Sequence, residues 1–476
     1  MRRTKIVCTM GPNENDYELM KRLGMTMDVA RFNFSHGDHA EHLERYELLK
    51  RVRQETGRPI AALLDTKGPE IRTGLLEDHQ KIMLKSGDRI VLSTEECVGS
   101  KDRVYINYSG LCEDVKEGNV ILIDDGLIGL KVLEGAGKEI RCEITNGGEL
   151  GGRKGVNVPN VQIRLPSLTE QDIDDIRFGL DEGFDFVAAS FIRNAQAIED
   201  IRKLIDEAGS NMKIIAKIES QEGLDNLQEI INAADGIMVA RGDLGVEIEA
   251  RRLPQLQKEI IEKCNYEGKL VITATQMLDS MIRNPRPTRA EVTDVATAVY
   301  DGTDAVMLSG ESANGKYPVE AAQMMASIVE YTEQFLNYKQ FKTRVLEKSL
   351  YESIGNAVCA ATVTTAHEIQ AKAIIVPTLT GATASMIAKY RPRTSIVALS
   401  PSQQTTRQMM LFWGVSPIWA RRADTTDELF DSSLEELRSR HLVETGDLCV
   451  ITAGVLSRLT RRQPVTSTNI MRVIQA

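Results

Sequence analysis

The sequence predicts an α/β protein built on a (β/α)8 TIM barrel, with a small β-barrel lid domain inserted into it and an open α/β domain at the C-terminus. Three observations predict this fold class. Eight short apolar runs alternate with amphipathic helical segments, a stretch without helical periodicity interrupts them, and the alternation restarts near residue 345. Eight strand–helix units fit a parallel barrel whose strand ends share one rim.

The predicted barrel strands are short and rich in β-branched residues. They are KIVCTM (5–10), VARFNFS (29–35), IAALLDT (60–66), DFVAASFI (185–192), KIIAKIE (213–219), GIMVARGD (236–243), LVITATQM (270–277) and AVMLSGE (305–311). Between most of them lie helical segments such as 194–209 and 254–268. Thr288 and Glu291 form a T-x-x-E capping box for a further helix, which should end before Gly302.

The interruption lies between the third and fourth barrel strands. It contains strand-like stretches at 88–96, 120–134 and 139–145, joined by turn signals such as SGD, DDG and NGG. We therefore expect a barrel domain at 1–68 and 168–344, with the β domain at 69–167 inserted on a βα loop, where it can act as a lid. Five later strands, at 371–378, 395–401, 414–420, 447–454 and 469–476, predict an α/β domain over 345–476.

The composition describes a globular protein and narrows its partners. Of 476 residues, 42% are hydrophobic and 26% are charged. The net charge of −10 argues against nucleic-acid or anionic-membrane partners, which favour basic surfaces. Seven scattered cysteines without CxxC spacing predict free thiols rather than disulfides or a zinc site. Because no apolar run approaches the ~20 residues of a bilayer span and no signal-peptide pattern is present, we expect a cytoplasmic protein.

Polar side chains end six of the eight predicted strands. The sets are Arg31, Asn33 and Ser35; Asp65, Thr66 and Lys67; Lys217 and Glu219; Arg241 and Asp243; Thr273, Thr275 and Gln276; and Ser309 and Glu311. Taken singly, each set suits a structural ion pair or hydrogen bonds to loop backbone. In a barrel, however, all of them meet at the rim where barrel enzymes carry out chemistry, so together they favour an active site.

The residue types indicate which chemistry that site suits. Lys217 and Glu219 are two residues apart on one strand and therefore point the same way. Glu219 and Asp243 offer two hard oxygen ligands, which suit Mg²⁺ or Mn²⁺ completed by water and substrate. Lys217, Arg31 and the backbone N–H groups of the Gly242 loop would face an anion beside the metal. Such a site suits phosphoryl transfer or enolate stabilisation, because both develop negative charge.

Long motifs throughout the chain resemble those of the pyruvate kinase family. They are RFNFSHG (31–37), LLDTKGPEIRTG (63–74), GGRKGVNVP (151–159), IIAKIESQEG (214–223), MVARGDLGVEI (238–248) and the run from Ala274 to Ala313. The resemblance implies glycolytic transfer of a phosphoryl group from phosphoenolpyruvate to ADP, giving pyruvate and ATP. It also implies Mg²⁺ and K⁺ as cofactors, a homotetramer, and a barrel with a β lid and a C-terminal α/β domain.

The same resemblance implies roles for the motif residues. Lys217 would neutralise the transferring phosphoryl group and the enolate oxygen, Arg31 would bind phosphate, and Thr275, with Gly242 and Asp243, would hold the substrate carboxylate. The remaining implied sets are Glu219 and Asp243 for Mg²⁺; Asn33, Ser35, Asp65 and Thr66 for K⁺; and Asn33, Ser35, His36, Arg72 and Lys154 for the nucleotide. Glu70 stands where K⁺-independent relatives tend to have lysine, which implies K⁺ activation. The proton donor to the enolate stays open, with Thr275 one candidate.

The C-terminal domain departs from the family pattern. TLTGATAS (378–385) follows a predicted strand and opens a helix, so Thr380, Thr383 and Ser385 are candidates to bind the phosphate of an allosteric effector, with an ordinary helix cap as the alternative. Ala382 replaces a basic residue of many relatives, which leaves open whether a sugar-phosphate activator binds weakly, differs or does not bind. Arg461 and Arg462 are candidates to replace that charge, with a solvated basic loop as the alternative.

The residues leave two other classes of function open. One is a different Mg²⁺-dependent barrel lyase for enolpyruvate compounds, which would have no need of a lid carrying Lys154. The other is a catalytically silent sensor of sugar phosphates, against which the complete set of Arg31, Lys217, Glu219, Asp243 and Thr275 argues.

Overall fold

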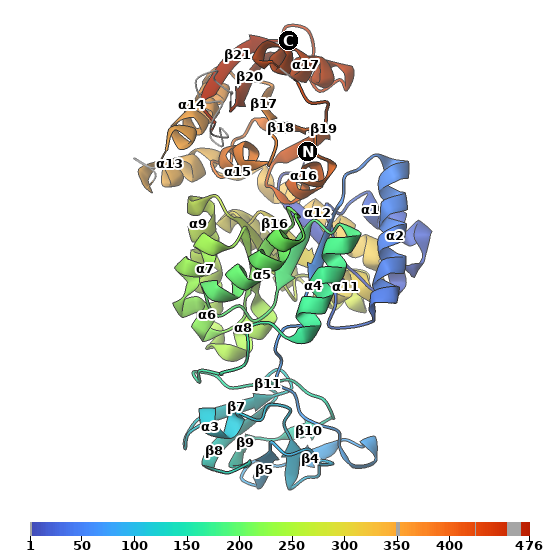
Figure 1. Ribbon diagram of the computed structural model, residues 1–476, viewed down its shortest axis with the longest axis vertical. Coiled ribbons are helices and arrows are strands. Elements are labelled where there is room, and N and C mark those ends of the chain that lie inside the picture. Colours follow the sequence, from blue (N-terminus) through green and yellow to red (C-terminus); the bar gives the residue numbers. More distant parts are fainter. Residues whose placement is uncertain (1, 349–352, 424, 455–467) are drawn as a thin grey trace.

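The computed structural model describes residues 2–348, 353–423, 425–454 and 468–476. The molecule is elongated, with the barrel in the middle, a β domain at one end and the C-terminal α/β domain at the other (Figure 1). The three-part fold class expected from the sequence is confirmed, while the domain boundaries at residues 68, 167 and 344 stay predictions. In the described ranges, no helix is long and apolar enough to cross a membrane.

Eight parallel strands close the barrel in the order β1-β16-β15-β14-β13-β12-β3-β2. They are β1 (Lys5–Met10), β2 (Val29–Asn33), β3 (Ala61–Asp65), β12 (Phe186–Ala189), β13 (Lys213–Ile218), β14 (Gly236–Ala240), β15 (Leu270–Ala274) and β16 (Ala305–Leu308). All eight predicted strands are therefore present. Several end earlier than predicted, most clearly β14, because residues 241–243 begin the short helix α8 (Arg241–Glu247).

Helices surround the barrel. They are α1 (Tyr17–Gly24), α2 (His39–Thr56), α4 (Glu170–Glu182), α5 (Ala195–Glu207), α6 (Gln221–Asp225), α7 (Leu227–Ala233), α9 (Leu253–Glu267), α10 (Arg289–Asp301), α11 (Gly310–Ala313) and α12 (Pro318–Glu333). The predicted capping box of Thr288 and Glu291 starts α10, and Gly302 ends it with φ 99°. Thus the local helix signals in the sequence were correct.

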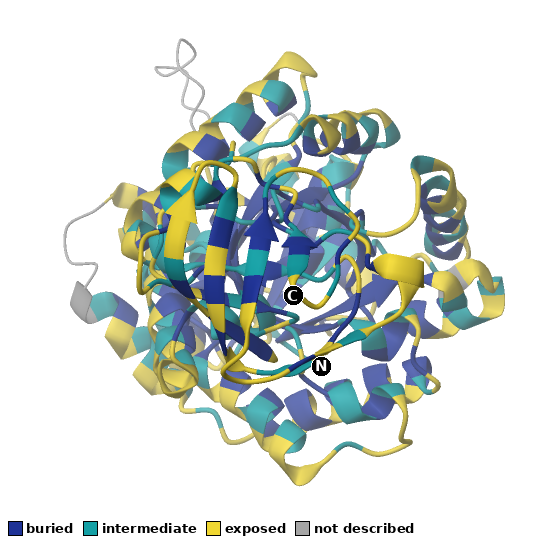
Figure 2. Cartoon of the chain, turned by 90° about the horizontal axis from the view of Figure 1, so that it is seen from below, coloured by how far each residue is buried: buried dark blue, intermediate teal, exposed yellow. Residues whose placement is uncertain are grey.

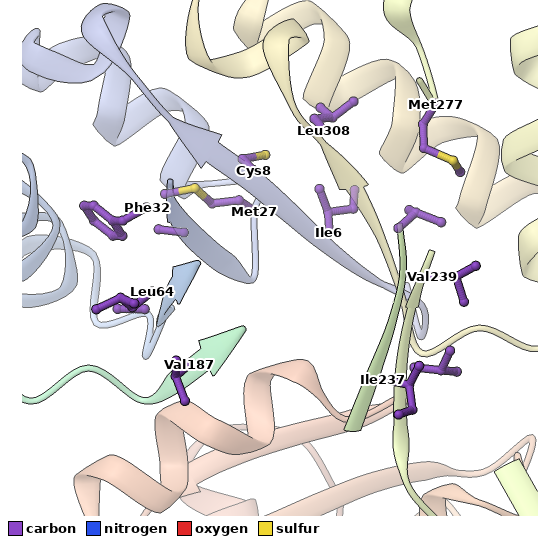
Figure 3. Close-up of a cluster of buried hydrophobic side chains, with 14 of the residues drawn as sticks. Ile6, Cys8, Met27, Phe32, Leu64, Val187, Ile237, Val239, Met277 and Leu308 are labelled. Carbon is purple, nitrogen blue, oxygen red and sulfur yellow. The ribbon is translucent and has the colours of Figure 1, made fainter. Parts of the chain in front are cut away.

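The barrel core alternates along each strand. Ile6 and Cys8 of β1 pack into the cluster shared with the helices, whereas Val7 between them belongs to a second cluster, which continues into the C-terminal domain. Figure 3 shows the first cluster, with side chains such as Phe32 and Val239 projecting from several strands. The period-two pattern thus separates a strand–helix layer from the barrel interior.

The β domain is a curled sheet. Its six strands lie in the order β11-β7-β8-β9-β5-β6, beside a two-stranded ribbon of β10 and β4. The bounds are β4 (Ile82–Leu84), β5 (Arg89–Ser93), β6 (Arg103–Tyr105), β7 (Val120–Ile123), β8 (Ile128–Ala136), β9 (Glu139–Asn146), β10 (Gly148–Leu150) and β11 (Val156–Asn157), with the short helix α3 (Leu111–Asp114). Buried and exposed residues alternate along its strands, which face the viewer in Figure 2.

One segment joins the two edges of this sheet. Arg72 pairs with Gly155, next to β11, and Thr73 pairs with Ile106, next to β6. The residues that lead out of the barrel therefore bridge both edges, which curls the sheet towards the small barrel expected from the sequence.

The C-terminal domain is the predicted open α/β unit. Its sheet has the order β19-β18-β17-β20-β21, in which only the pairing of β20 with β21 is antiparallel. The elements are β17 (Ala373–Pro377), β18 (Ser395–Ser400), β19 (Val415–Trp419), β20 (Leu448–Ala453), β21 (Ile470–Gln475), α13 (Tyr338–Lys348), α14 (Ile354–Glu368), α15 (Ala382–Ala388), α16 (Gln403–Gln408) and α17 (Thr426–Ser439). All five predicted strands are present.

An aspartate precedes every second barrel strand and ties it to the strand before it in the chain. Asp28, Asp185, Asp235 and Asp304 accept hydrogen bonds of 2.8–3.0 Å from the backbone N–H groups of Ile6, Ala62, Ile214 and Val271 respectively. Two of the four also bind an arginine of the C-terminal domain: Asp185 with Arg407 at 2.8 Å and Asp304 with Arg391 at 2.9 Å. The C-terminal domain is thereby held on the N-terminal rim, away from the polar strand ends.

Candidate active site

Lys217 lies at the centre of the polar rim. Its Nζ is 2.9 Å from Glu219 Oε1 and 3.1 Å from Asp65 Oδ1, and it donates to Ser190 Oγ at 2.7 Å. β13 ends at Ile218, one residue earlier than predicted, but the prediction that the Lys217 and Glu219 side chains point the same way is confirmed. Burial by itself lowers the pKa of Lys217, but the charges of Asp65 and Glu219 outweigh it and raise the pKa above its ordinary value. The side chain is therefore a permanent cation.

Asp65 connects the two cations of the site. Its Oδ2 accepts from Arg31 Nε at 2.6 Å while its Oδ1 faces Lys217. Burial would raise the pKa of Asp65, but Arg31 and Lys217 hold it below the ordinary range. Arg31 also donates to Thr9 Oγ1 at 2.9 Å. Asp65 thus orients both Arg31 and Lys217, a role that the sequence did not reveal.

Glu219 and Asp243 are the two carboxylates predicted to hold a metal. Burial raises the pKa of Glu219 to about 7, with Lys217 opposing and the charge of Asp243 adding to the shift. Burial also raises the pKa of Asp243, where Lys217 opposes and Asp125 and Glu70 add. Glu219 Oε2 accepts from the Phe191 backbone N–H at 2.6 Å.

These two carboxylates fit a hard divalent cation. Both are buried, and the charge of Asp243 adds to the burial that raises the pKa of Glu219, so a cation between them would favour the ionised form of both. Within the described residues, no group of three or more histidine, cysteine, aspartate or glutamate side chains could hold a metal ion by itself. Two carboxylates completed by substrate and water are the donor set that Mg²⁺ usually takes.

Thr275 follows β15 in a strained turn. Thr275 and Gln276 have φ values of 69° and 54°, which are unfavourable for a β-branched residue such as threonine. The Thr275 hydroxyl accepts from Gly242 N–H at 2.7 Å. Arg241 supports the turn by donating to the carbonyls of Ala274 and Thr275 at 3.1 and 2.7 Å. The structure therefore brings Thr275 and Gly242 together as predicted, and adds Arg241 as their support.

The predicted K⁺ ligands lie on neighbouring strand ends. Asn33 of β2 is the register partner of Asp65 on β3, and Asn33 Oδ1 accepts from the Ser35 N–H at 3.2 Å. The Thr66 hydroxyl accepts from Ser190 N–H at 3.2 Å, and the Thr66 carbonyl accepts from Ser190 Oγ at 2.6 Å. The Asn33 amide oxygen, the Asp65 carboxylate and the Thr66 hydroxyl thus have protein partners in this conformation. The role of the four residues towards K⁺ stays a prediction.

A cavity of about 810 Å³ lies between the barrel and the β domain. Its lining includes Arg72, Lys154, Asp243 and Phe191. Arg72 pairs with Glu70 at 2.6 Å and Lys154 pairs with Asp124 at 2.9 Å, so both predicted phosphate ligands are held by carboxylates beside the cavity. His36 is exposed on the loop after β2. The cavity is large enough for substrates and its walls are strongly charged.

Sequence reasoning missed the partners contributed by the two strands that it had left without polar sets. Thr9 ends the first predicted strand and receives Arg31, whereas Ser190 and Phe191 end the fourth and bind Lys217 and Glu219. The only sequence signal for these partners was one hydroxyl residue near the end of each apolar run, Thr9 in the first and Ser190 in the fourth. Such a residue also occurs in ordinary strands, so its partner becomes evident only from the barrel.

The predicted effector loop follows β17 and opens α15, as expected. Thr383 Oγ1 lies 2.8 Å from Thr468 Oγ1, and Ser385 Oγ donates to the Gly268 carbonyl of the barrel at 3.0 Å. Thr380 Oγ1 accepts from Ala382 N–H at 3.4 Å. These hydroxyls serve local and interdomain contacts here, and an effector role stays a prediction. Arg461 and Arg462 lie outside the described residues.

Comparison with known proteins gives one consistent result. The family model for the pyruvate kinase barrel domain matches residues 1–322, and the model for the pyruvate kinase alpha/beta domain matches 356–474. A pyruvate kinase of Sporosarcina psychrophila is 50% identical over 465 residues, covering 96% of this chain and 78% of that protein. One of Clostridium acetobutylicum is 46% identical over 477 residues, covering 99% of each. The crystal structure of a pyruvate kinase from Cryptosporidium parvum matches with a TM-score of 0.93 at 36% identity, covering 100% of this chain and 96% of that one.

Proposed function

The chain belongs to the pyruvate kinase family, and on that premise we propose how its residues transfer a phosphoryl group from phosphoenolpyruvate to ADP, giving pyruvate and ATP. One observation carries the assignment of roles: a permanently charged lysine lies between Asp65 and Glu219 at the barrel rim. Phosphoryl transfer needs fixed positive charge where the phosphoryl oxygens and the enolate oxygen gain negative charge.

Lys217 and Arg31 supply that positive charge. Lys217 contacts the transferring phosphoryl group and the enolate oxygen, and Arg31 binds the phosphate from the neighbouring strand. Because Asp65 holds both cations through one carboxylate, they are oriented before substrate arrives. The cost of reorganising charge at the moment of transfer is thereby reduced.

Glu219 and Asp243 hold Mg²⁺ or Mn²⁺ in this proposal. When bound, the metal supplies Lewis-acid stabilisation to the substrate oxygens. Asn33, Ser35, Asp65 and Thr66 form the K⁺ site, which requires their present hydrogen bonds to open towards the ion. The carboxylates are otherwise unfavourably buried, which supports a bound cation at Glu219 and Asp243.

The substrate carboxylate binds at the start of α8. The N–H groups of Gly242 and Asp243 lie in the first turn of that helix, where backbone donors attract anions. Gly242 N–H donates to the Thr275 hydroxyl at 2.7 Å, and this hydroxyl donates to the Ala274 carbonyl at 2.6 Å, so the two groups lie side by side and turn to the carboxylate when substrate binds. Thr275 is also a candidate in the proton route to the enolate carbon, whose donor stays open.

The β domain closes the site over the nucleotide. Arg72 and Lys154 line the cavity from that side, and their bonds to Glu70 and Asp124 exchange for bonds to phosphate when ADP binds. Asn33, Ser35 and His36 contact the nucleotide from the barrel. Closure excludes water, which would otherwise capture the phosphoryl group.

Regulation and assembly follow from family membership rather than from this site. We propose a homotetramer in the cytoplasm, with a phosphorylated effector bound through Thr380, Thr383 and Ser385. Titration of sugar phosphates against the wild type, Thr383→Ala and Arg461→Ala tests the effector site. Activation that is identical in all three proteins contradicts it.

The reaction is tested by mixing the protein with phosphoenolpyruvate, ADP, Mg²⁺ and K⁺ and measuring ATP and pyruvate separately. We expect equal amounts of both, with a strict need for ADP. Consumption of phosphoenolpyruvate without ATP would indicate a lyase or phosphatase, and binding without turnover would indicate a sensor.

A further inference from the structure

Two chain segments connect the barrel to the β domain, and one buried carboxylate binds both. Figure 1 shows these segments below the barrel, the outgoing one after β3 and the returning one before α4. Asp172, in the first turn of α4, is fully buried. Its Oδ1 accepts from the Gly68 N–H of the outgoing segment at 2.8 Å. Its Oδ2 accepts from the N–H and hydroxyl of Thr169, at the end of the returning segment, at 2.9 and 2.7 Å.

The outgoing contact is close to the catalytic side chains. Gly68 has φ 73°, and a Cβ built there would lie 2.8 Å from side-chain atoms of both Ser190 and Phe191. Ser190 Oγ receives the Lys217 ammonium, and the Phe191 N–H binds Glu219. A shift of Gly68 therefore presses on the residues that orient Lys217 and Glu219.

Further contacts limit where the segments can bend. Arg193 donates to the carbonyls of Ile163 and Leu165 and so holds the returning segment against the barrel. Arg164 between them pairs with Asp114 of the β domain at 2.6 Å. On the outgoing side, Arg72 and Thr73 already belong to the curled sheet. On the outgoing side the stretch left to bend therefore lies between Gly68 and Arg72. On the returning side it lies before Ile163, because Arg193 holds the residues after it against the barrel.

We propose that Asp172 is the positioning residue of the lid, a role that rests on the proposed phosphoryl transfer. It joins the barrel ends of both connecting segments at one point, so the stretches that bend start from a fixed spacing and the β domain turns on them as a unit. Each closure then returns Arg72 and Lys154 to the same place over Lys217. A carboxylate suits this task, because charge-assisted hydrogen bonds to three donors at once are stronger and more directional than neutral ones.

The competing explanation is that Asp172 merely caps α4, since Thr169 and Asp172 form the capping box of that helix. Thr169→Ala is the matched control. It removes the hydroxyl of the cap but keeps the carboxylate and its bond to Gly68. Asp172→Ala removes the carboxylate and, with it, the bond to Gly68. If capping is the whole role, the two variants should lose similar stability and behave alike in catalysis.

The decisive measurement is the ratio of pyruvate to ATP formed from phosphoenolpyruvate and ADP. A lid that closes in the wrong place admits water, so phosphoenolpyruvate plus water gives pyruvate plus inorganic phosphate, without ATP. For Asp172→Ala we expect kcat to fall about 10–100-fold, as for a roughly 1 Å misplacement of reacting groups. We also expect a pyruvate-to-ATP ratio clearly above one, while Thr169→Ala keeps a ratio of one.

The position of the lid is measured independently as the distance between two spin labels. One label is attached at Met83→Cys in the β domain and the other at Gln228→Cys in the barrel. Cys97 and Cys112, the two cysteines that are not buried, are first replaced by serine. We expect a broadened distance distribution in Asp172→Ala with substrates bound, and a wild-type distribution in Thr169→Ala. If Asp172→Ala does not fold, Asp172→Asn is used. The asparagine side chain has the same size, but its NH₂ group cannot accept a hydrogen bond, so the bond to either Gly68 or Thr169 is lost.

The outcomes separate the two proposals. A wild-type chain that makes no ATP overturns the proposed function. A wild-type chain that makes ATP, with Asp172 variants that keep a ratio of one and an unchanged distance distribution, overturns the positioning role alone.

Discussion

The ammonium of Lys217 on β13 and the carboxylate of Glu219, directly after that strand, face each other across 2.9 Å at the barrel rim. Asp65 approaches the same ammonium from β3 at 3.1 Å. Lys217 therefore compensates two buried carboxylates while remaining available to substrate oxygens.

Lys217→Met should reduce kcat by about 10³-fold or more, because a preorganised charge at the transferring group is lost. The matched control is Lys213→Met, at the other end of the same strand, where Lys213 lies near Asp235. We expect Lys213→Met to stay close to the wild-type rate. Coupled ATP formation measures activity, and circular dichroism checks that both variants fold. A near wild-type rate in Lys217→Met would remove the role given to this lysine.

Metal affinity should depend on pH near neutrality. Burial raises the pKa of Glu219 to about 7, so the carboxylate is mostly ionised above pH 7 and mostly protonated below it. Protons then compete with the metal, and the dissociation constant for Mn²⁺ or Mg²⁺ should rise about tenfold per pH unit below 7. Titration calorimetry of the substrate-free protein between pH 5.5 and 8 measures it. Glu219→Gln should bind more weakly and lose this dependence; an unchanged pH profile would argue against Glu219 as a ligand.

Potassium should activate the enzyme. Asn33, Ser35, Asp65 and Thr66 lie on neighbouring strand ends, and a monovalent cation there adds positive charge near the phosphate ligand Arg31. We expect low turnover in buffer containing tetramethylammonium as the only monovalent cation, and recovery on addition of KCl. Matched ionic strength separates this effect from screening. Full activity without K⁺ and Na⁺ would contradict the assignment.

The interdomain ion pair of Arg391 with Asp304 should contribute to stability. Both side chains are almost completely buried, so Arg391→Met leaves an uncompensated charge and should cost about 3–5 kcal/mol in the free energy of unfolding. The control is Arg440→Met, whose partner Glu436 lies four residues earlier on an exposed face of the same domain. Exposed pairs contribute about 0–1 kcal/mol, so that variant should change little. Denaturant unfolding measures the free energy of unfolding of both variants. Equal losses would show that the buried ion pair contributes no more to stability than the exposed one.

Much of the site was predictable because strand periodicity is a local property. The period of two predicted that Lys217 and Glu219 point the same way, and the structure confirms their contact although β13 ends at Ile218. The capping box at Thr288 was equally readable, since all its atoms lie within four residues. Asp65, in contrast, was expected only as a K⁺ ligand, because its pairs with Arg31 and Lys217 join residues far apart in the chain.

The sequence by itself determined the strand and helix order, the β insertion and which polar residues end which strand, because hydrophobic periodicity and turn chemistry act over a few residues. Tertiary structure decided which of those side chains touch. Barrel closure set the strand register that places Asp65 between two cations. The packing of the two segments that connect the barrel to the β domain brought Gly68 to Asp172, although the two residues are 104 positions apart in the chain. Such contacts depend on how whole elements pack, and no local pattern encodes the distance between two of them.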